Sequence, residues 1–198
     1  GGGIGDTSCP TGYVRDASGT CVIDDPDKPC EGNPVKKPEI ASSGTSGKNG
    51  GRFGQTRVDK FGNPKDHDGV DIKSEVGSKL FSMQSGIVSD VRTSFEPGQH
   101  IKNSFGNYVQ ITSKINGKTI VLKFNHLQSV SVKKGDSIET GQILGKTGIT
   151  GNAAAKGVTP HIHITTWEVT GSEWKLVNPE NFISATYDSN GNLKSPCN

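Results

Sequence analysis

The sequence predicts a mainly β protein: an antiparallel β-sheet core with long loops, preceded by an irregular N-terminal arm. Its 198 residues include 27 glycines and 10 prolines. This composition disfavours helices, because each glycine costs a helix about 1 kcal/mol and each proline about 3. Apolar and polar residues alternate in short segments such as residues 107–112, which is typical of half-buried antiparallel strands. No stretch repeats apolar residues at helical spacing over several turns.

Nine short segments, separated by turn residues, qualify as strands. They are residues 70–73, 79–83, 86–92, 106–113, 118–126, 129–132, 142–146, 161–169 and 174–177. In the fourth segment, Val109 and Ile111 share one face because side chains alternate along a strand. Asn116 and Gly117 separate the fourth segment from the fifth and predict a tight hairpin, since both residues readily adopt the positive φ that such a turn requires.

The composition divides the chain into three parts. Residues 1–45 hold scattered apolar residues and the run Asp-Asp-Pro-Asp-Lys-Pro at positions 24–29, which is typical of extended or turning backbone. We expect an irregular, disulfide-linked N-terminal arm there. Residues 46–184 carry the strand pattern and are expected to form the folded domain, followed by a C-terminal tail at residues 185–198.

Four cysteines, Cys9, Cys21, Cys30 and Cys197, allow three disulfide pairings. Two turn-rich clusters between Cys9 and Cys21 bring the ends of a small loop together, so we favour the pairs Cys9–Cys21 and Cys30–Cys197. A zinc site is the weaker alternative, because the sequence has no Cys-x-x-Cys and no histidine near these residues. Paired cysteines indicate an oxidising compartment, and we expect a secreted, periplasmic or cell-envelope protein.

Charge and hydropathy argue against two classes of protein. A formal net charge of +2 provides no clustered basic face for a nucleic acid. No apolar run approaches the roughly 18 residues that span a bilayer. The first four residues are neither basic nor followed by an apolar stretch, so we expect that a secretory signal has been removed or that export uses another route. We expect a monomer without a nucleic-acid partner or a transmembrane segment.

Four of the five histidines stand in patterns that suggest chemistry. His67 and Asp71 form His-x-x-x-Asp, and on one strand a spacing of four places both side chains on the same face. An imidazole and a carboxylate at that separation can share a cation such as Zn²⁺, although the pattern alone is common by chance. Gly69, between them, permits a close approach of the backbone or an unusual dihedral angle.

His161 and His163 form His-x-His within an apolar, β-branched run. A strand places both imidazoles on one face and Ile162 and Ile164 on the other. Two neutral histidines side by side on a sheet suit a metal, and two exposed histidines on an edge strand are the alternative.

The remaining two histidines are less informative by themselves. His126 ends a predicted strand, where a histidine is most often structural, and His100 lies in a polar loop and is expected at the surface. In chain order, however, His67-x-x-x-Asp71, Asn-His126-Leu and Thr-Pro-His161-Ile-His163 resemble the zinc endopeptidases of the M23 family, of the lysostaphin and LytM type. Residues 132–148 resemble that family's strand-turn-strand stretch, and the likeness covers about residues 51–182.

The resemblance implies a sheet with a central groove and a zinc metalloendopeptidase that hydrolyses peptide bonds of bacterial peptidoglycan, in the stem or the cross-bridge. It assigns one Zn²⁺ per chain to His67, Asp71 and His163. It leaves His161 and His126 as catalytic residues, and a neutral imidazole near zinc can take a proton from water near operating pH. We expect His161 to act as the general base. We expect His126 to hydrogen-bond the tetrahedral intermediate or to share in the proton transfer.

The substrate should be read by the loops at residues 95–105 and 148–159, since loops on a rigid sheet commonly carry specificity. Two alternatives stay open. A secreted antibacterial toxin would use the same chemistry and have an immunity protein as a partner. A non-catalytic cell-wall-binding regulator would be favoured by loss of a motif residue, but His67, Asp71, His161 and His163 are all present.

Overall fold

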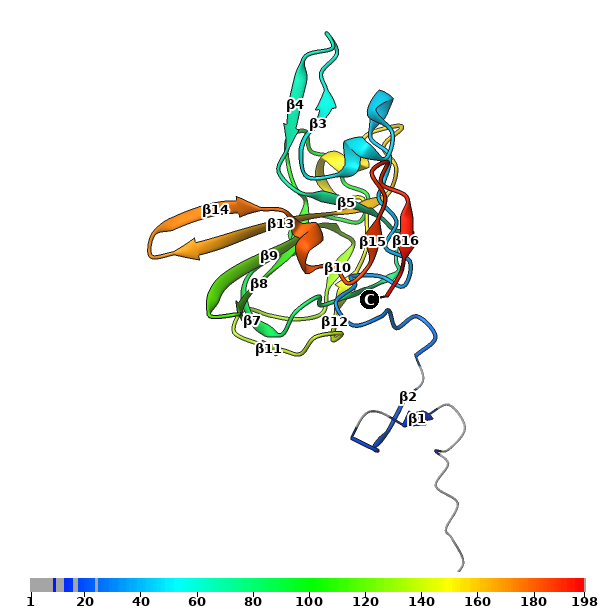
Figure 1. Ribbon diagram of the computed structural model, residues 1–198, viewed down its shortest axis with the longest axis vertical. Helices are drawn as coiled ribbons and strands as arrows, with labels where there is room; N and C mark the ends of the chain where they lie inside the picture. Colours follow the sequence, from blue (N-terminus) through cyan, green and yellow to red (C-terminus); the bar gives the residue numbers. More distant parts are fainter. Residues whose placement is uncertain (1–8, 10–12, 16–17, 24, 198) are drawn as a thin grey trace, which may run out of the picture.

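A seven-stranded antiparallel sheet forms the centre of the computed structural model, which describes residues 9, 13–15, 18–23 and 25–197 (Figure 1). The strands lie in the order β11, β7, β8, β9, β13 and β14, and β5 also pairs with β13. They are β5 (Val70–Lys73), β7 (Gly86–Arg92), β8 (Asn107–Ile115), β9 (Lys118–Leu127), β11 (Ser137–Ile138), β13 (His161–Thr170) and β14 (Glu173–Val177). This sheet confirms the mainly β, antiparallel fold class.

Smaller elements surround the central sheet. A three-stranded sheet contains β6 (Lys79–Phe81), β10 (Ser129–Val130) and β12 (Ile143–Lys146), and two-stranded hairpins pair β1 (Tyr13–Arg15) with β2 (Cys21–Ile23), β3 (Gly54–Val58) with β4 (Pro64–His67), and β15 (Thr186–Tyr187) with β16 (Leu193–Ser195). The helical elements of the described residues are the short 3₁₀ turns η1 (Gly44–Ser46), η2 (Asn49–Gly51), η3 (Gly151–Ala154) and η4 (Pro179–Phe182). Within this part of the chain, no helix has the length and apolar character needed to cross a membrane.

The predicted strands all coincide with strands of the structure, with ends that differ by at most two residues. The hairpin between β8 and β9 is confirmed: Ile115 pairs with Lys118, and Asn116 and Gly117 adopt φ values of 50° and 77°. The hairpin β3–β4 was not predicted, because its residues are mostly polar and carry no apolar alternation. In Figure 1 this hairpin and the hairpin β13–β14 both project from the body of the protein.

The hydrophobic core lies under one face of the central sheet. Its fully buried side chains include Leu122 and Phe124 on β9 and Ile162 and Ile164 on β13, while Leu144 contributes from the smaller sheet. Burial of each such side chain stabilises the fold by about 1.5–3 kcal/mol relative to an exposed one. Since side chains alternate along β13, His161 and His163 lie on its other face, away from this core.

The N-terminal arm joins this core. Val35 and Ile40 are buried in it, and Ile40 forms an isolated β-bridge with Ile72 on β5. The disulfides Cys9–Cys21 and Cys30–Cys197 are both present, which confirms the favoured pairing, and the second one links the arm to the end of the described chain. The division of the chain at residues 45 and 184 remains a prediction.

Candidate active site

Four strands bring the motif residues together. His67 ends β4, Asp71 lies on β5, His126 lies near the end of β9, and His161 and His163 begin β13. β13 runs antiparallel to β5, and the register places His163 opposite Asp71. His67 and His163 are 96 positions apart in sequence, yet their rings lie 5.0 Å apart between centroids.

The prediction that His67 and Asp71 share one strand is wrong. A bend at Asp68 and Gly69 separates β4 from β5. The bend passes close against β13: a Cβ atom at Gly69 would lie 2.7 Å from Cε1 of His163 and closer still to the carbonyl oxygen of Ile164. The expected close approach at Gly69 is thus confirmed, and it brings His67 to Asp71 by folding the chain rather than by alternation along a strand.

Three atoms that could bind a metal ion converge at the centre of the site. Nε2 of His67 lies 3.3 Å from Oδ1 of Asp71 and 3.1 Å from Nδ1 of His163, and Nδ1 of His163 lies 2.8 Å from the same carboxylate oxygen. Tetrahedral zinc binds imidazole and carboxylate ligands at about 2.0–2.2 Å, which requires donor atoms about 3.3 Å apart. These residues therefore fit one zinc ion in chemistry and in spacing.

Hydrogen bonds hold His67 in the tautomer that a metal requires. Its Nδ1–H donates to the carbonyl oxygen of Arg52 at 2.9 Å, which leaves the lone pair of Nε2 facing Asp71 and His163. A metal-binding histidine commonly donates its second ring nitrogen to a carbonyl or carboxylate, because this bond fixes the tautomer and the ring orientation.

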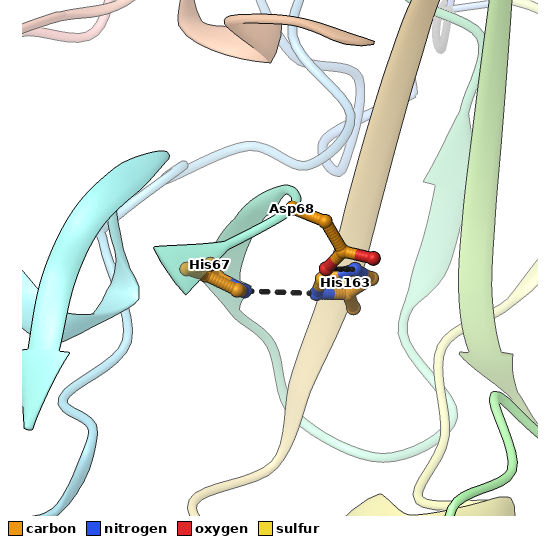
Figure 2. Close-up of side chains that lie close together, drawn as sticks. All are labelled: His67, Asp68 and His163. Atoms are coloured by element: carbon orange, nitrogen blue, oxygen red, sulfur yellow. Dashed lines mark hydrogen bonds and ion pairs between the residues drawn. The ribbon is translucent and has the colours of Figure 1, made fainter. Parts of the chain in front are cut away.

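Asp68 contacts the opposite edge of the His163 ring (Figure 2). Its Oδ1 lies 3.3 Å from Nε2 of His163, and Oγ1 of Thr165 lies 3.0 Å from the same nitrogen. His67, Asp68 and His163 place ligand atoms within 4.8 Å of one another, so they form a second possible ligand set. Asp71 fits better than Asp68. Asp71 and His67 both approach the same nitrogen of His163, Nδ1, and can therefore share one ion with it. Asp68 approaches the other ring nitrogen, Nε2, and is half exposed.

The charges at the centre are strongly coupled. Burial lowers the pKa of His163, but hydrogen bonds and charges of Asp68 and Asp71 outweigh burial and raise this pKa to about 9. Burial raises the pKa of Asp71, yet its hydrogen bonds to His163 and His67 hold the pKa well below its usual range. These shifts favour an ionised Asp71 that accepts a hydrogen bond from a protonated His163 at neutral pH.

His161 and His126 form the second pair. Nδ1–H of His161 donates to the carbonyl oxygen of Thr159 at 2.7 Å, and Nδ1–H of His126 donates to that of Thr150 at 2.9 Å. Each ring therefore keeps an unprotonated Nε2. Their rings meet edge to face with centroids 5.2 Å apart, and the pKa values of both are lowered mainly by burial, that of His126 to about 3. Both are neutral proton acceptors at physiological pH.

His126 has an uncommon backbone conformation, with φ at 65°. Non-glycine residues seldom adopt positive φ, and such conformations persist where the surrounding structure imposes them. The backbone amide of His126 donates to the carbonyl oxygen of Phe105, and the Phe105 ring stacks on His163 with centroids 5.3 Å apart. His100, by contrast, lies exposed in its loop as expected.

Arg57 on β3 was missed by the sequence interpretation. Its guanidinium donates to Oδ2 of Asp71, to Nε2 of His67 at 3.0 Å and to the carbonyl oxygen of Gly50 at 2.6 Å. The contact holds the carboxylate oxygen that faces away from His163. No local pattern distinguishes Arg57 in sequence, because its partners come from other elements.

The four histidines border an open cavity of about 530 Å³. The predicted loop at residues 148–159 contributes much of its wall, including Asn152, Lys156 and Thr159, while the loop at residues 95–105 contributes Phe105. The arm adds Ser42 and residues next to it. The cavity provides the groove that the resemblance implied.

Residues 65–179 match the family model of peptidase family M23. The chain belongs to this family. The match covers more than half of the sequence and includes all of the motif histidines, so the resemblance is confirmed.

Among curated relatives, the chain is 32% identical over 97 residues to the peptidoglycan DD-endopeptidase ShyA of Vibrio cholerae, covering 49% of this chain and 19% of that protein. It is 26% identical over 132 residues to an uncharacterized metalloprotease of Buchnera aphidicola, covering 67% of this chain and 30% of that protein. The chain thus matches less than a third of the length of these relatives.

Among solved structures, a zinc-containing peptidase from Vibrio cholerae superposes with a TM-score of 0.55 at 21% identity, covering 84% of this chain and 45% of that one. This similarity supports the shared fold.

Proposed function

We propose that the protein is a zinc-dependent endopeptidase that hydrolyses peptide bonds of bacterial peptidoglycan, in the stem or the cross-bridge. The observation that carries this proposal is the convergence of three donor atoms with two neutral histidines at one end of an open cavity. Family membership supports peptide-bond hydrolysis, and the names of the curated relatives support peptidoglycan as the substrate class.

His67, Asp71 and His163 would hold one Zn²⁺ per chain. When bound, the ion polarises a carbonyl group and lowers the pKa of water towards about 7. Arg57 donates to the outer oxygen of Asp71, Oδ2, while Oδ1 is directed at the two histidines. Catalytic zinc sites are commonly four-coordinate, with three protein ligands and a fourth position open to water or substrate. The three residues named here would leave that fourth position open.

His161 is proposed as the general base. Its Nε2 lies 3.6 Å from Oδ1 of Asp71, so it borders the proposed metal position. The family resemblance, rather than this distance, assigns His161 a role outside the ligand set. The hydrogen bond from Nδ1 to Thr159 holds the ring with its unprotonated nitrogen towards the site. Having accepted a proton from water, His161 could return it to the leaving amine, the usual role of a positioned acid–base group.

His126 is proposed to stabilise the charge that develops on the substrate carbonyl or to share the proton transfer. Its ring is buried, fixed by Thr150 and in edge-to-face contact with His161. Such fixed groups stabilise a transition state because they need no reorientation during the reaction, and loss of one commonly costs 10²–10³ in rate.

The proposed location is secreted, periplasmic or within the cell envelope, where peptidoglycan lies. The two disulfides support an oxidising compartment. A monomer is proposed, since one chain supplies all the residues of the site.

Digestion of purified peptidoglycan tests this function. The protein should release new free amino groups and lower the cross-linking seen by mass analysis of muropeptides, and a chelator should stop the reaction until zinc is restored. The matched control is Lys133→Ala, which alters an exposed residue outside the cavity and outside both predicted substrate loops and should leave the rate unchanged. Zinc-loaded protein that leaves intact walls and soluble muropeptides uncut would overturn the proposal.

A further inference from the structure

The face of β13 that carries the catalytic histidines continues into an exposed apolar patch. Alternation along the strand places Trp167 and Val169 on the same face as His161 and His163. Pairing with β14 adds Leu176 opposite Trp167 and Trp174 opposite Val169. We call these four residues, Trp167, Val169, Trp174 and Leu176, the tryptophan patch. It lies on the hairpin that projects from the body in Figure 1.

The patch exposes large apolar side chains that the fold could have covered. Trp174 is 54% exposed and Leu176 42% exposed, and the two indole rings meet edge to face with centroids 5.9 Å apart. Single exposed apolar residues are ordinary, but neighbouring exposed apolar side chains gathered on one face indicate a binding surface. The opposite face of the hairpin is polar and includes Glu168 and Lys175, which are paired across the two strands.

The position of the patch relates it to the proposed reaction. Trp167 follows His163 by four residues on an uninterrupted strand, a separation of about 13 Å. Peptidoglycan consists of short peptides attached to a glycan strand, and an extended peptide covers about the same distance in four residues. A peptide cut at the histidines and extending along this face would bring its sugar-bearing end to the tryptophan patch.

A cation lies between the two regions. Lys123 on β9 is paired with Thr165, the residue between His163 and Trp167 on this face. Its Nζ lies 3.8 Å from the centre of the Tyr108 ring and 5.5 Å from that of Phe105. Peptidoglycan stems carry carboxylates, so Lys123 is placed to attract the peptide part of the same ligand.

From these observations we propose that the tryptophan patch binds a hexosamine ring of the glycan strand while the attached peptide occupies the histidine site. The inference rests on the proposed function. Sugar rings present apolar C–H faces and polar edges, and an indole ring offers a flat apolar face with a polar N–H for such a surface. An apolar patch on the strand face that carries His161 and His163, at the reach of a stem peptide, matches that ligand.

Intrinsic fluorescence tests this proposal directly, because the chain has two tryptophans and both belong to the patch. Titration of the full chain with the N-acetylglucosamine tetramer should give a saturable change in emission. Trp174→Ala keeps Trp167 as the reporter and should weaken the affinity about tenfold, the effect of losing a ring that contributes about 1.4 kcal/mol to binding. Lys175→Ala, on the opposite face of the same strand, is the matched control and should bind like the wild type.

Hydrolysis distinguishes failure of this proposal from failure of the proposed function. Trp174→Ala should raise KM about tenfold for a sugar-bearing cross-linked muropeptide and leave cleavage of the same cross-linked peptide without sugars unchanged. If the wild type cuts neither substrate, the proposed function fails, and the titration still decides the sugar site. If the wild type cuts both substrates but Trp174→Ala does not raise KM for the sugar-bearing one, the proposed sugar site is wrong.

Two further results would overturn the sugar site. One is the absence of any saturable emission change in the wild type. The other is a Trp174→Ala variant that retains sugar binding but converts a dimer into a monomer on size-exclusion chromatography, since the patch would then be a protein interface.

Discussion

In the first half of β13, His163 is buried and the side chain of His161 is 12% exposed, and both rings are hydrogen-bonded at their nitrogens; in the second half, Trp167 and Val169 are partly exposed and apolar. Both halves present these side chains to the same face of one strand. The usual distribution of polar and apolar residues is thus reversed along a single strand. Buried polar groups retain a fixed geometry because each must keep a partner, whereas an exposed apolar surface remains free to bind. Under the two proposals, the strand separates the reacting histidines from the sugar-binding surface by about four residues.

The largest expected effect lies in the buried half. His163→Ala should lose both zinc and activity, because two remaining ligands bind the ion far more weakly. His161→Ala should keep its zinc and lose at least about 10² in hydrolysis, the usual value of a positioned acid–base group. Metal content by elemental analysis and muropeptide release measure the two effects. Equal zinc loss in both variants would mean that base and ligand are exchanged, and unchanged hydrolysis in His161→Ala would place the base elsewhere, with His126 the next candidate.

A pH titration sharpens the assignment of the metal position. The pKa of His163, about 9 without a metal, means that zinc must displace a proton from this ring below that pH. As the pH is lowered, the apparent affinity for zinc should fall about tenfold per pH unit, which is about a hundredfold between about pH 8.5 and about pH 6.5. Asp71 contributes no such change, because its pKa lies far lower. Competition with a chelator of known protonation measures the slope, and a flat profile would exclude His163 as the group displaced.

Asp68 should show a smaller effect on the same site. Asp68→Asn removes the charge at Nε2 of His163 but retains an oxygen that can accept the hydrogen bond. The zinc affinity should weaken about tenfold, as is common when a residue that orients a ligand is changed. Asp66→Asn, at an exposed acid two positions earlier, is the matched control for charge and should leave the affinity unchanged. Complete loss of zinc in Asp68→Asn would instead indicate that Asp68 is itself a ligand.

Local patterns in the sequence were sufficient for the strands and for much of the site. Alternation identifies β13, and the His-x-His spacing on it places both rings on one face as expected. The turn at Asn116 and Gly117 follows from the conformational preferences of the two residues themselves. These features depend on neighbours within a few positions, which a single sequence displays.

Features that depend on distant partners were not predicted. Arg57 and Asp68 acquire their roles by contact with His163 and Asp71 across separate strands. The close approach at Gly69 was expected, but its partner on β13 was not, because nothing in the local pattern shows that β13 passes against this bend. The local pattern around His126 is that of an ordinary strand-terminal histidine; only the family resemblance singled it out, and the carbonyl of Thr150 that fixes its ring lies 24 positions away. Such roles arise only once the sheet has brought the elements together.

The smallest expected effect concerns stability and tests the exposed half of β13. Trp174→Ala should change the free energy of unfolding by less than about 0.5 kcal/mol, the range of surface substitutions, because most of its ring remains in solvent. Ile164→Ala, on the core face of the same strand, should cost about 2–5 kcal/mol, since its side chain is fully buried. Urea unfolding followed by circular dichroism, with chelator present so that zinc adds no stability to either variant, measures both. A loss above about 2 kcal/mol in Trp174→Ala would assign the tryptophan pair to the stability of the hairpin, and the contrast between a chemical half and a binding half of β13 would then be wrong.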